Sequence, residues 1–283
     1  MMRKITVVVP VYKQWHHLRS LLAGFDEQTL SPMEFDLFLV ANEPLPDGYR
    51  LPKTSFPVTL CACLKPGSYV ARNFGASQAK SDLLTFTDAD CRPAPDFLRQ
   101  LLMAHEKSPE AILAGRVEIL PAEHRTLWSD YDCLRGIPQE RYVARGYGAC
   151  ANLTVPRALF DADGGFDETR LSGGDAEFCR RLSVPVLYVG EAVVTHPCRE
   201  TFSDVWCKAR RVRGGQIRSG SLKRRAAWTV LSFLPPFRES GQIWRVPFPI
   251  QQRIRAILAQ NLLWACLMAE SLRLLFRGEP ERR

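Results

Sequence analysis

No apolar run in this sequence reaches the roughly 18 residues that would propose a membrane-spanning helix. The apolar stretch at residues 5–9 ends at Pro10 and is too short for a secretion signal. The nine cysteines contain no Cys-x-x-Cys pair, and the closest two are Cys61 and Cys63. This spacing matches neither a zinc site nor a disulfide framework. We therefore expect reduced, buried thiols and a cytoplasmic protein.

Charge is unevenly distributed along the chain. Residues 1–198 hold 21 Lys or Arg and 24 Asp or Glu, a net charge of −3. Residues 199–283 hold 17 and 6, a net charge of +11, and are also rich in Leu, Trp and Phe. This combination favours an anionic membrane surface or another polyanionic ligand, and the alternative is a solvated basic face. We expect no nucleic-acid partner.

Hydrophobic periodicity predicts a sheet with alternating helices over the first two thirds of the chain. The expected strands cover residues 4–9, 35–40, 58–64, 83–87, 111–120 and 186–194. The expected helices cover residues 15–28, 69–80, 96–106 and, in the tail, 251–276. Strands that alternate with helices form a parallel sheet with helices on both faces. Ligands bind such sheets at the carboxyl ends of the strands, so function is expected in the loops there.

Two carboxylates follow the apolar strand at residues 83–87, in the motif Asp88-Ala89-Asp90. Paired carboxylates in an open cleft repel each other and favour a hard cation such as Mg²⁺ or Mn²⁺. The cation would bridge diphosphate oxygens and neutralise a leaving group. Asp-x-Asp is common by chance, and the alternative is an ordinary turn before a helix.

The segment upstream adds an anion-binding pattern. Gly67 lies just before the predicted helix at residues 69–80, which carries Ala71-Arg72-Asn73. Glycine permits close backbone approach, and a helix start offers N–H donors to an anion. Arg72 supplies a planar fork for a phosphate or a base edge. The alternative for Arg72 is an ordinary surface position.

A second glycine-rich region carries another carboxylate. Gly164-Gly165-Phe166-Asp167-Glu168 precedes Gly173-Gly174-Asp175, after which a helix is predicted. Asp175 at the start of that helix is a plausible general base toward an acceptor hydroxyl, and an ordinary helix-capping role is equally compatible with its position.

These motifs, taken in order, resemble family 2 glycosyltransferases, which are inverting enzymes with the GT-A-type nucleotide-sugar-binding fold. The resemblance covers about residues 4–200 and rests on the order of five motifs: residues 5–12, Ala71-Arg72-Asn73, Asp88-Ala89-Asp90, residues 164–168 and Gly174-Asp175. It implies a catalytic domain over residues 1–200 and a basic, apolar, helical extension over residues 201–283.

The resemblance also implies roles for single residues. Pro10, Tyr12 and Arg72 would belong to the nucleotide pocket, and Asp88 would contact the nucleotide-sugar. Asp90 would ligate the metal, and Asp175 would be the catalytic base.

The sequence departs from the family pattern at two positions. Ala41 stands where the family usually has an Asp that reads a uracil ring, so Asn42 or Glu43 would have to replace it. The identity of the nucleobase is therefore open. Gly174 stands where many members carry Glu before the catalytic Asp.

Several downstream features allow two interpretations. His196-Pro197 follows the last predicted strand, at a place where many relatives have a His-Pro pair. His196 is a second metal-ligand candidate, and a structural role is the alternative. The arginines at 210, 211 and 213 could clamp a diphosphate or face a membrane. The uncharged residues 256–269 favour a helix that lies in a membrane interface, with packing on the catalytic domain or in a homodimer as the alternative.

The predicted function is inverting transfer of a sugar from a nucleoside diphosphate sugar to an acceptor hydroxyl. A membrane-held enzyme suggests a saccharide or lipid-linked saccharide acceptor, and a role at the inner face of the cell membrane in polysaccharide or glycolipid assembly. Two other classes stay open. One is a catalytically inactive, nucleotide-binding partner protein, and the other is a sugar nucleotidyltransferase, whose Gly-rich basic signature is missing from residues 10–14.

Overall fold

The computed structural model describes residues 3–276 and 278–281. The chain divides into two compact units. The first unit consists of Met1–Glu118, Ile137–Glu168 and Gly174–His196. The second unit consists of Ile119–Gly136, Thr169–Gly173 and Pro197–Arg283.

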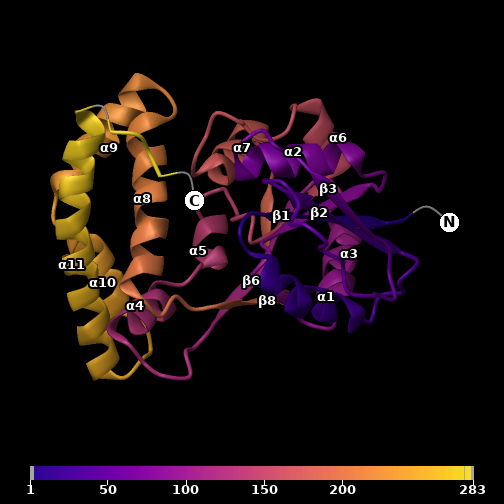
Figure 1. Ribbon diagram of the computed structural model, residues 1–283, viewed down its shortest axis with the longest axis horizontal. Coiled ribbons are helices and arrows are strands. Elements are labelled where there is room, and N and C mark those ends of the chain that lie inside the picture. Colours follow the sequence, from indigo (N-terminus) through magenta and orange to yellow (C-terminus); the bar gives the residue numbers. More distant parts are fainter. Residues whose placement is uncertain (1–2, 277, 282–283) are drawn as a thin grey trace. The chain divides into compact units, whose positions relative to one another are not determined.

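The first unit contains the sheet and most of the predicted elements. Its strands are β1 (Ile5–Val11), β2 (Phe35–Ala41), β3 (Val58–Ala62), β4 (Leu83–Thr87), β5 (Arg92–Pro93), β6 (Ile112–Leu120), β7 (Asn152–Pro156) and β8 (Val186–Pro197). Its helices are η1 (Trp15–His17), α1 (Leu18–Asp26), α2 (Ser68–Gln78), α3 (Phe97–Lys107), α5 (Gln139–Val143), α6 (Arg157–Ala162) and α7 (Gly174–Leu182). Figure 1 shows α2, α6 and α7 on one side of the sheet, with α1 and α3 on the other.

The sheet has the strand order β3-β2-β1-β4-β7-β6-β8-β5. Neighbouring strands from β3 to β4 are parallel, and their carboxyl ends therefore meet at one edge. All residues of β1 and β4 except Pro10 are buried, which explains their mostly apolar sequences. The predicted α/β class is confirmed.

The structure differs from the prediction at β7, which runs antiparallel between β4 and β6. Its sequence, Asn-Leu-Thr-Val-Pro, contains polar residues at buried positions and therefore does not read as a core strand. The buried hydroxyls of Thr154 and Thr85 hydrogen-bond each other at 2.9 Å across the β4–β7 pair. Tertiary pairing thus satisfies the polar groups that obscure the strand in the sequence.

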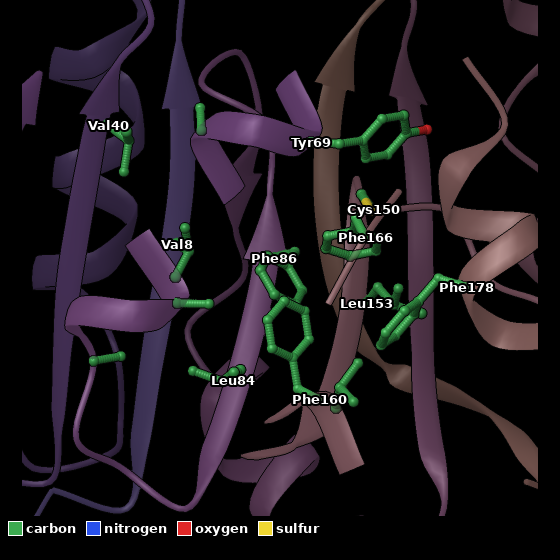
Figure 2. Close-up of a cluster of buried hydrophobic side chains, with 14 of the residues drawn as sticks. Val8, Val40, Tyr69, Leu84, Phe86, Cys150, Leu153, Phe160, Phe166 and Phe178 are labelled. Carbon is green, nitrogen blue, oxygen red and sulfur yellow. The ribbon is translucent and has the colours of Figure 1, made fainter. Parts of the chain in front are cut away.

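Aromatic side chains form the core beneath the glycine-rich motif. Phe166 lies 5.1 Å from Phe86, 5.5 Å from Phe160 and 4.7 Å from Phe178 between ring centroids. Figure 2 shows this cluster gathered beside β4. Phe166 thereby joins the loop at residues 164–168 to α6, α7 and the sheet.

Helix α2 lies close to the sheet because of one glycine. A Cβ atom at Gly75 would come within 2.9 Å of the Val40 side chain and would also collide with Val8. This close approach places α2, which carries Arg72 and Asn73, directly beside the strand ends.

The second unit is helical. Its helices are α4 (Leu127–Arg135), α8 (Phe202–Arg218), α9 (Leu222–Phe233), α10 (Phe237–Trp244) and α11 (Ile250–Leu275). Helix α11 buries Ala256, Ala259, Leu263 and Leu267 in an apolar cluster with residues of α4, α8 and α10. Arg210, one of the three arginines singled out above, pairs with the buried carboxylate of Glu270 at 3.2 Å.

Within residues 3–276 and 278–281, no helix combines the length and the apolar character needed to cross a membrane.

Candidate active site

Asp88 and Arg72 form an ion pair at the carboxyl end of β4. Arg72 Nη2 donates to Asp88 Oδ1 at 2.5 Å, and the Arg72 side chain is only 6% exposed. The carboxylate of Asp88 is about one third exposed. A buried, fixed guanidinium can therefore orient a carboxylate that still reaches a ligand.

Asp90 joins three segments that are distant in the sequence. Gln14 Nε2, in the loop after β1, donates to Asp90 Oδ2 at 2.9 Å. His196 Nε2, near the end of β8, lies 3.5 Å from the same oxygen. The structure thus brings together Asp90 and His196, the two metal-ligand candidates. His196 lies inside β8, which is three residues longer than expected at this end.

His17 belongs to the same neighbourhood and was missed in the sequence. Burial lowers its pKa, and His16 and His196 lower it further, whereas Asp90 raises it. Gln14 and His17 lie in a short loop and a 3-10 turn after β1, where no periodic pattern marks them.

The residues present fit a divalent cation that is bound together with a substrate. In the described part of the chain, no group of three or more His, Cys, Asp or Glu side chains is arranged to hold a metal ion. Mg²⁺ is commonly held by one or two carboxylates plus substrate phosphates. Asp90 with His196 supplies a carboxylate and an imidazole, and a diphosphate would provide further oxygen ligands.

Asp175 lies in the first turn of α7, and its carboxylate contacts Cys150 and Tyr69. Its Oδ1 accepts from the Ala176 N–H at 2.9 Å, and its Oδ2 accepts from the Cys150 N–H at 3.3 Å. Burial raises the pKa of this carboxyl, although both N–H donors and the Arg72 charge act against the shift. A carboxylate with a raised pKa is a stronger proton acceptor, as general-base chemistry requires.

Tyr69, on α2, holds the start of α7. Its hydroxyl oxygen accepts from the Gly174 N–H at 2.8 Å and from the Asp175 N–H at 3.4 Å. Its own proton points to Asp175 Oδ1 at 3.5 Å. Burial raises the pKa of Tyr69 well above its usual value, so this proton stays in place. The phenol therefore satisfies two N–H groups of the helix start and also contacts the candidate base.

The glycine at position 174 has a local explanation. A Cβ atom there would lie 2.7 Å from the Tyr69 ring, so a larger residue and this tyrosine position exclude each other. The departure from the family pattern noted in the sequence is thus coupled to Tyr69.

Cys150 is a further residue that the sequence did not reveal. It is buried beside Asp175, and burial raises the pKa of its thiol well above the usual value, whereas the Arg72 charge acts in the opposite direction. The thiol is therefore neutral, and its backbone N–H contacts the candidate base. Figure 2 shows Tyr69 and Cys150 above Phe166, at one end of the aromatic cluster.

Asn73 explains why two of the sequence motifs occur together. Its side-chain amide donates to Phe166 O at 2.8 Å and accepts from the Phe166 N–H at 2.9 Å. It also donates to Glu168 Oε1 at 3.2 Å, and Lys65 pairs with Glu168 Oε2 at 2.5 Å. Residues 164–168 are therefore fixed to α2, the helix that carries Arg72.

Asn42 follows β2 and uses its side chain to hold backbone. Its Nδ2 donates to Cys63 O at 2.7 Å and to Lys65 O at 2.8 Å, and its Oδ1 accepts from the Gly67 N–H at 2.8 Å. The amide is buried. It positions the loop before α2, and its predicted nucleotide contact stays a prediction.

Glu43 lies beside Asn42 and faces the loop after β1. Its Oε1 accepts from the Lys13 N–H at 2.5 Å and from Trp15 Nε1 at 2.8 Å. Pro10, in β1, and Tyr12, directly after it, are partly buried, and the Lys13 ammonium lies 5.2 Å from the Tyr12 ring centre. The candidate nucleotide-binding residues thus surround the neighbouring ends of β1 and β2, and Gln14 links this loop to Asp90.

Comparison with known proteins identifies the family. The sequence model of glycosyl transferase family 2 matches residues 6–163, more than half of the chain. Glycosyltransferase AglE of Haloferax volcanii is 25% identical, over 94% of this chain and 93% of that protein. The pre-mycofactocin glycosyltransferase of Mycobacterium tuberculosis is 27% identical over 75% of this chain, which spans 46% of that longer protein.

Solved structures show the same fold. Mannosyltransferase PcManGT from Pyrobaculum calidifontis, in complex with GDP-Man and Mn²⁺, aligns with a TM-score of 0.61 at 15% identity, over 99% of this chain and 89% of its own. TarS 1–349 of S. aureus, in complex with UDP-GlcNAc, aligns with a TM-score of 0.54 at 16% identity, over 95% and 89%. The predicted GT-A-type fold is confirmed. The chain belongs to glycosyl transferase family 2 and is a glycosyltransferase.

Proposed function

We propose that the enzyme transfers a sugar from a nucleoside diphosphate sugar to an acceptor hydroxyl, with inversion at the anomeric carbon. The observation that carries this proposal is the arrangement of Asp175. Its pKa is raised by burial, and two N–H donors and Tyr69 fix its orientation. One positioned base suits a single displacement, in which the acceptor oxygen attacks the face opposite the leaving group.

The first unit supplies the proposed catalytic domain, covering most of residues 1–200. Asp175 removes the acceptor proton as the new bond forms. Asp88, held by Arg72, orients the donor, and the ends of β1 and β2 with Pro10, Tyr12, Asn42 and Glu43 enclose the nucleotide.

Asp90 and His196 are the proposed metal ligands. Mg²⁺ or Mn²⁺ bound there would neutralise charge that develops on the leaving diphosphate. The PcManGT complex with GDP-Man and Mn²⁺, which has the same fold, supports the use of a divalent metal.

The acceptor is proposed to be a saccharide or a lipid-linked saccharide, reached by peripheral association with the inner face of the cell membrane. The support is the basic, apolar composition of residues 201–283, which belong to the second unit. Such an enzyme would act in cell-surface polysaccharide or glycolipid assembly.

Turnover of donors tests the proposal. We expect the purified enzyme with Mn²⁺ or Mg²⁺ to release nucleoside diphosphate from at least one member of a panel of UDP-, GDP- and dTDP-sugars. Water accepts the sugar slowly in such a screen, and a suitable hydroxyl acceptor should raise the rate. A protein that binds these donors but turns none over would be an inactive partner protein. Formation of a sugar nucleotide from a sugar phosphate would indicate a nucleotidyltransferase.

A further inference from the structure

One uncharged, exposed segment of the second unit has no role in the proposed transfer reaction. Residues 226–237 run from Ala226 within α9 through Pro235-Pro236 to the start of α10, and contain no Asp, Glu, Lys or Arg. Val230 is 65% exposed, Leu234 54% and Phe237 80%. Trp228, Leu231 and Phe233 are also exposed.

This exposure is unusual for a free protein surface. Scattered exposed apolar residues are normal, but several within one short segment are typical of a surface that contacts protein or lipid. Helix α9 buries little of itself, because Ser232 is its single buried residue. Its apolar side chains therefore do not contribute to the unit's own core.

Basic residues flank the segment on both sides. Lys223, Arg224 and Arg225 precede it, and Arg238 follows it. Arg224 and Arg225 donate to backbone carbonyls of α8 and the residue after it. Within residues 3–276 and 278–281, none of these four cations has a carboxylate partner, so their charge is not neutralised locally.

Helix α11 also exposes apolar side chains. Its outward side chains Ile254, Leu258, Leu262 and Leu272 are exposed, while the opposite side of the helix is buried. A groove of about 340 Å³ lies where α8, α9 and α11 meet. Apolar side chains, Leu222, Ala226 and Leu275 among them, form its walls together with Arg218 and Arg225.

An anionic lipid bilayer matches these features better than a second copy of the chain. Apolar side chains bordered by Lys and Arg, with Trp and Phe among them, are typical of segments that lie in a membrane interface. A second copy would bring its own flanking cations to the same surface, and like charges would face each other across the contact.

We propose that residues 226–237 insert into the interfacial layer of an anionic bilayer, with Lys223, Arg225 and Arg238 at the level of the lipid phosphates. This inference deepens the membrane association proposed above and assigns it to α9 and the turn after it. The sequence favours membrane contact by the last helix, α11. Here α11 adds exposed apolar side chains to a contact that residues 226–237 make.

Sedimentation with vesicles tests this assignment on the full chain. The test variant is Val230→Glu with Leu234→Glu, which changes one exposed position in α9 and one directly after it. The matched control is Met33→Glu with Met103→Glu, which makes the same change of charge at two exposed apolar positions of the first unit. Vesicles contain phosphatidylcholine alone or phosphatidylcholine with phosphatidylglycerol at a 3:1 ratio.

We expect wild type and the control to bind the anionic vesicles at low salt and to dissociate in 1 M NaCl, where charges are screened. The Val230→Glu, Leu234→Glu variant should bind at least tenfold more weakly, with unchanged thermal unfolding because both positions are exposed. Release of nucleoside diphosphate in solution should be the same in all three proteins.

Equal vesicle binding by the test variant and the control would overturn the assignment. A wild-type dimer in light scattering that the test variant alone dissociates, with no vesicle binding by wild type, would identify a contact between copies instead. Either result leaves the transfer reaction untouched, since donor turnover is measured without vesicles.

Discussion

We expect the Asp175→Asn variant to lose roughly 10²–10⁴-fold in kcat, the usual scale for removing a general base. Asparagine keeps the size of the side chain and one oxygen that can accept from the Ala176 N–H, but it cannot take a proton. Donor affinity should change little, because the proposed contacts with the donor come from Arg72, Asp88 and the ends of β1 and β2. Single-turnover kinetics and donor binding by calorimetry measure the two quantities separately.

Tyr69→Phe is the informative comparison for that experiment. It keeps the base but removes the hydroxyl that contacts Asp175 Oδ1 and accepts two N–H groups of α7. Loss of a donor to the carboxylate raises the pKa of Asp175 further, so the acid limb of the kcat/KM profile should move to higher pH.

One outcome for the Asp175→Asn variant would contradict the assignment of the base. If this variant keeps its kcat and binds the donor more weakly, Asp175 caps its helix and is not the base.

We expect the second large effect from the metal. Chelation should abolish transfer, and Asp90→Ala should lower kcat/KM by roughly 10²-fold or more, because a bound cation contributes several kcal/mol of charge stabilisation to a leaving diphosphate. Binding of Mn²⁺ in the presence of a nucleoside diphosphate, followed by electron paramagnetic resonance, should weaken in the same variant.

Glu110→Ala is the matched control for this experiment, since it removes an exposed carboxylate of the first unit. It should leave both turnover and Mn²⁺ binding at wild-type levels. Full activity of Asp90→Ala in excess chelator would show that the Asp90–His196 pair has a structural role.

Residues that form a local pattern were predictable from the sequence. The mostly apolar sequences of β1 and β4 are typical of strands that are buried on both faces. The geometry of parallel sheets then places function in the loops after these strands. The order of the motifs around Arg72, Asp88 and Asp175 then gave the family.

Residues that act through tertiary contacts were not predictable. In the sequence, Tyr69 is only the first residue of a predicted helix. The structure shows that its hydroxyl accepts an N–H group from the start of α7. Cys150 and Gln14 lie in segments without periodicity, and their contacts with Asp175 and Asp90 join parts of the chain that are far apart.

The tail illustrates the same limit. A run of apolar residues such as 226–237 reads alike whether it is buried or exposed, and only the structure shows that α9 leaves it uncovered. The sequence favours membrane contact by the last helix because its uncharged run is longer. In the structure, α11 buries one side against α4, α8 and α10.

The configuration of the newly formed glycosidic bond tests the central claim most directly. The enzyme is supplied with a donor of known anomeric configuration and an acceptor, and the product is followed by proton nuclear magnetic resonance from the first turnovers. A single displacement with Asp175 as base predicts a product anomer opposite to that of the donor. A product with the donor's configuration would contradict this account, because retention requires a different arrangement of reacting groups from the one proposed around Asp175.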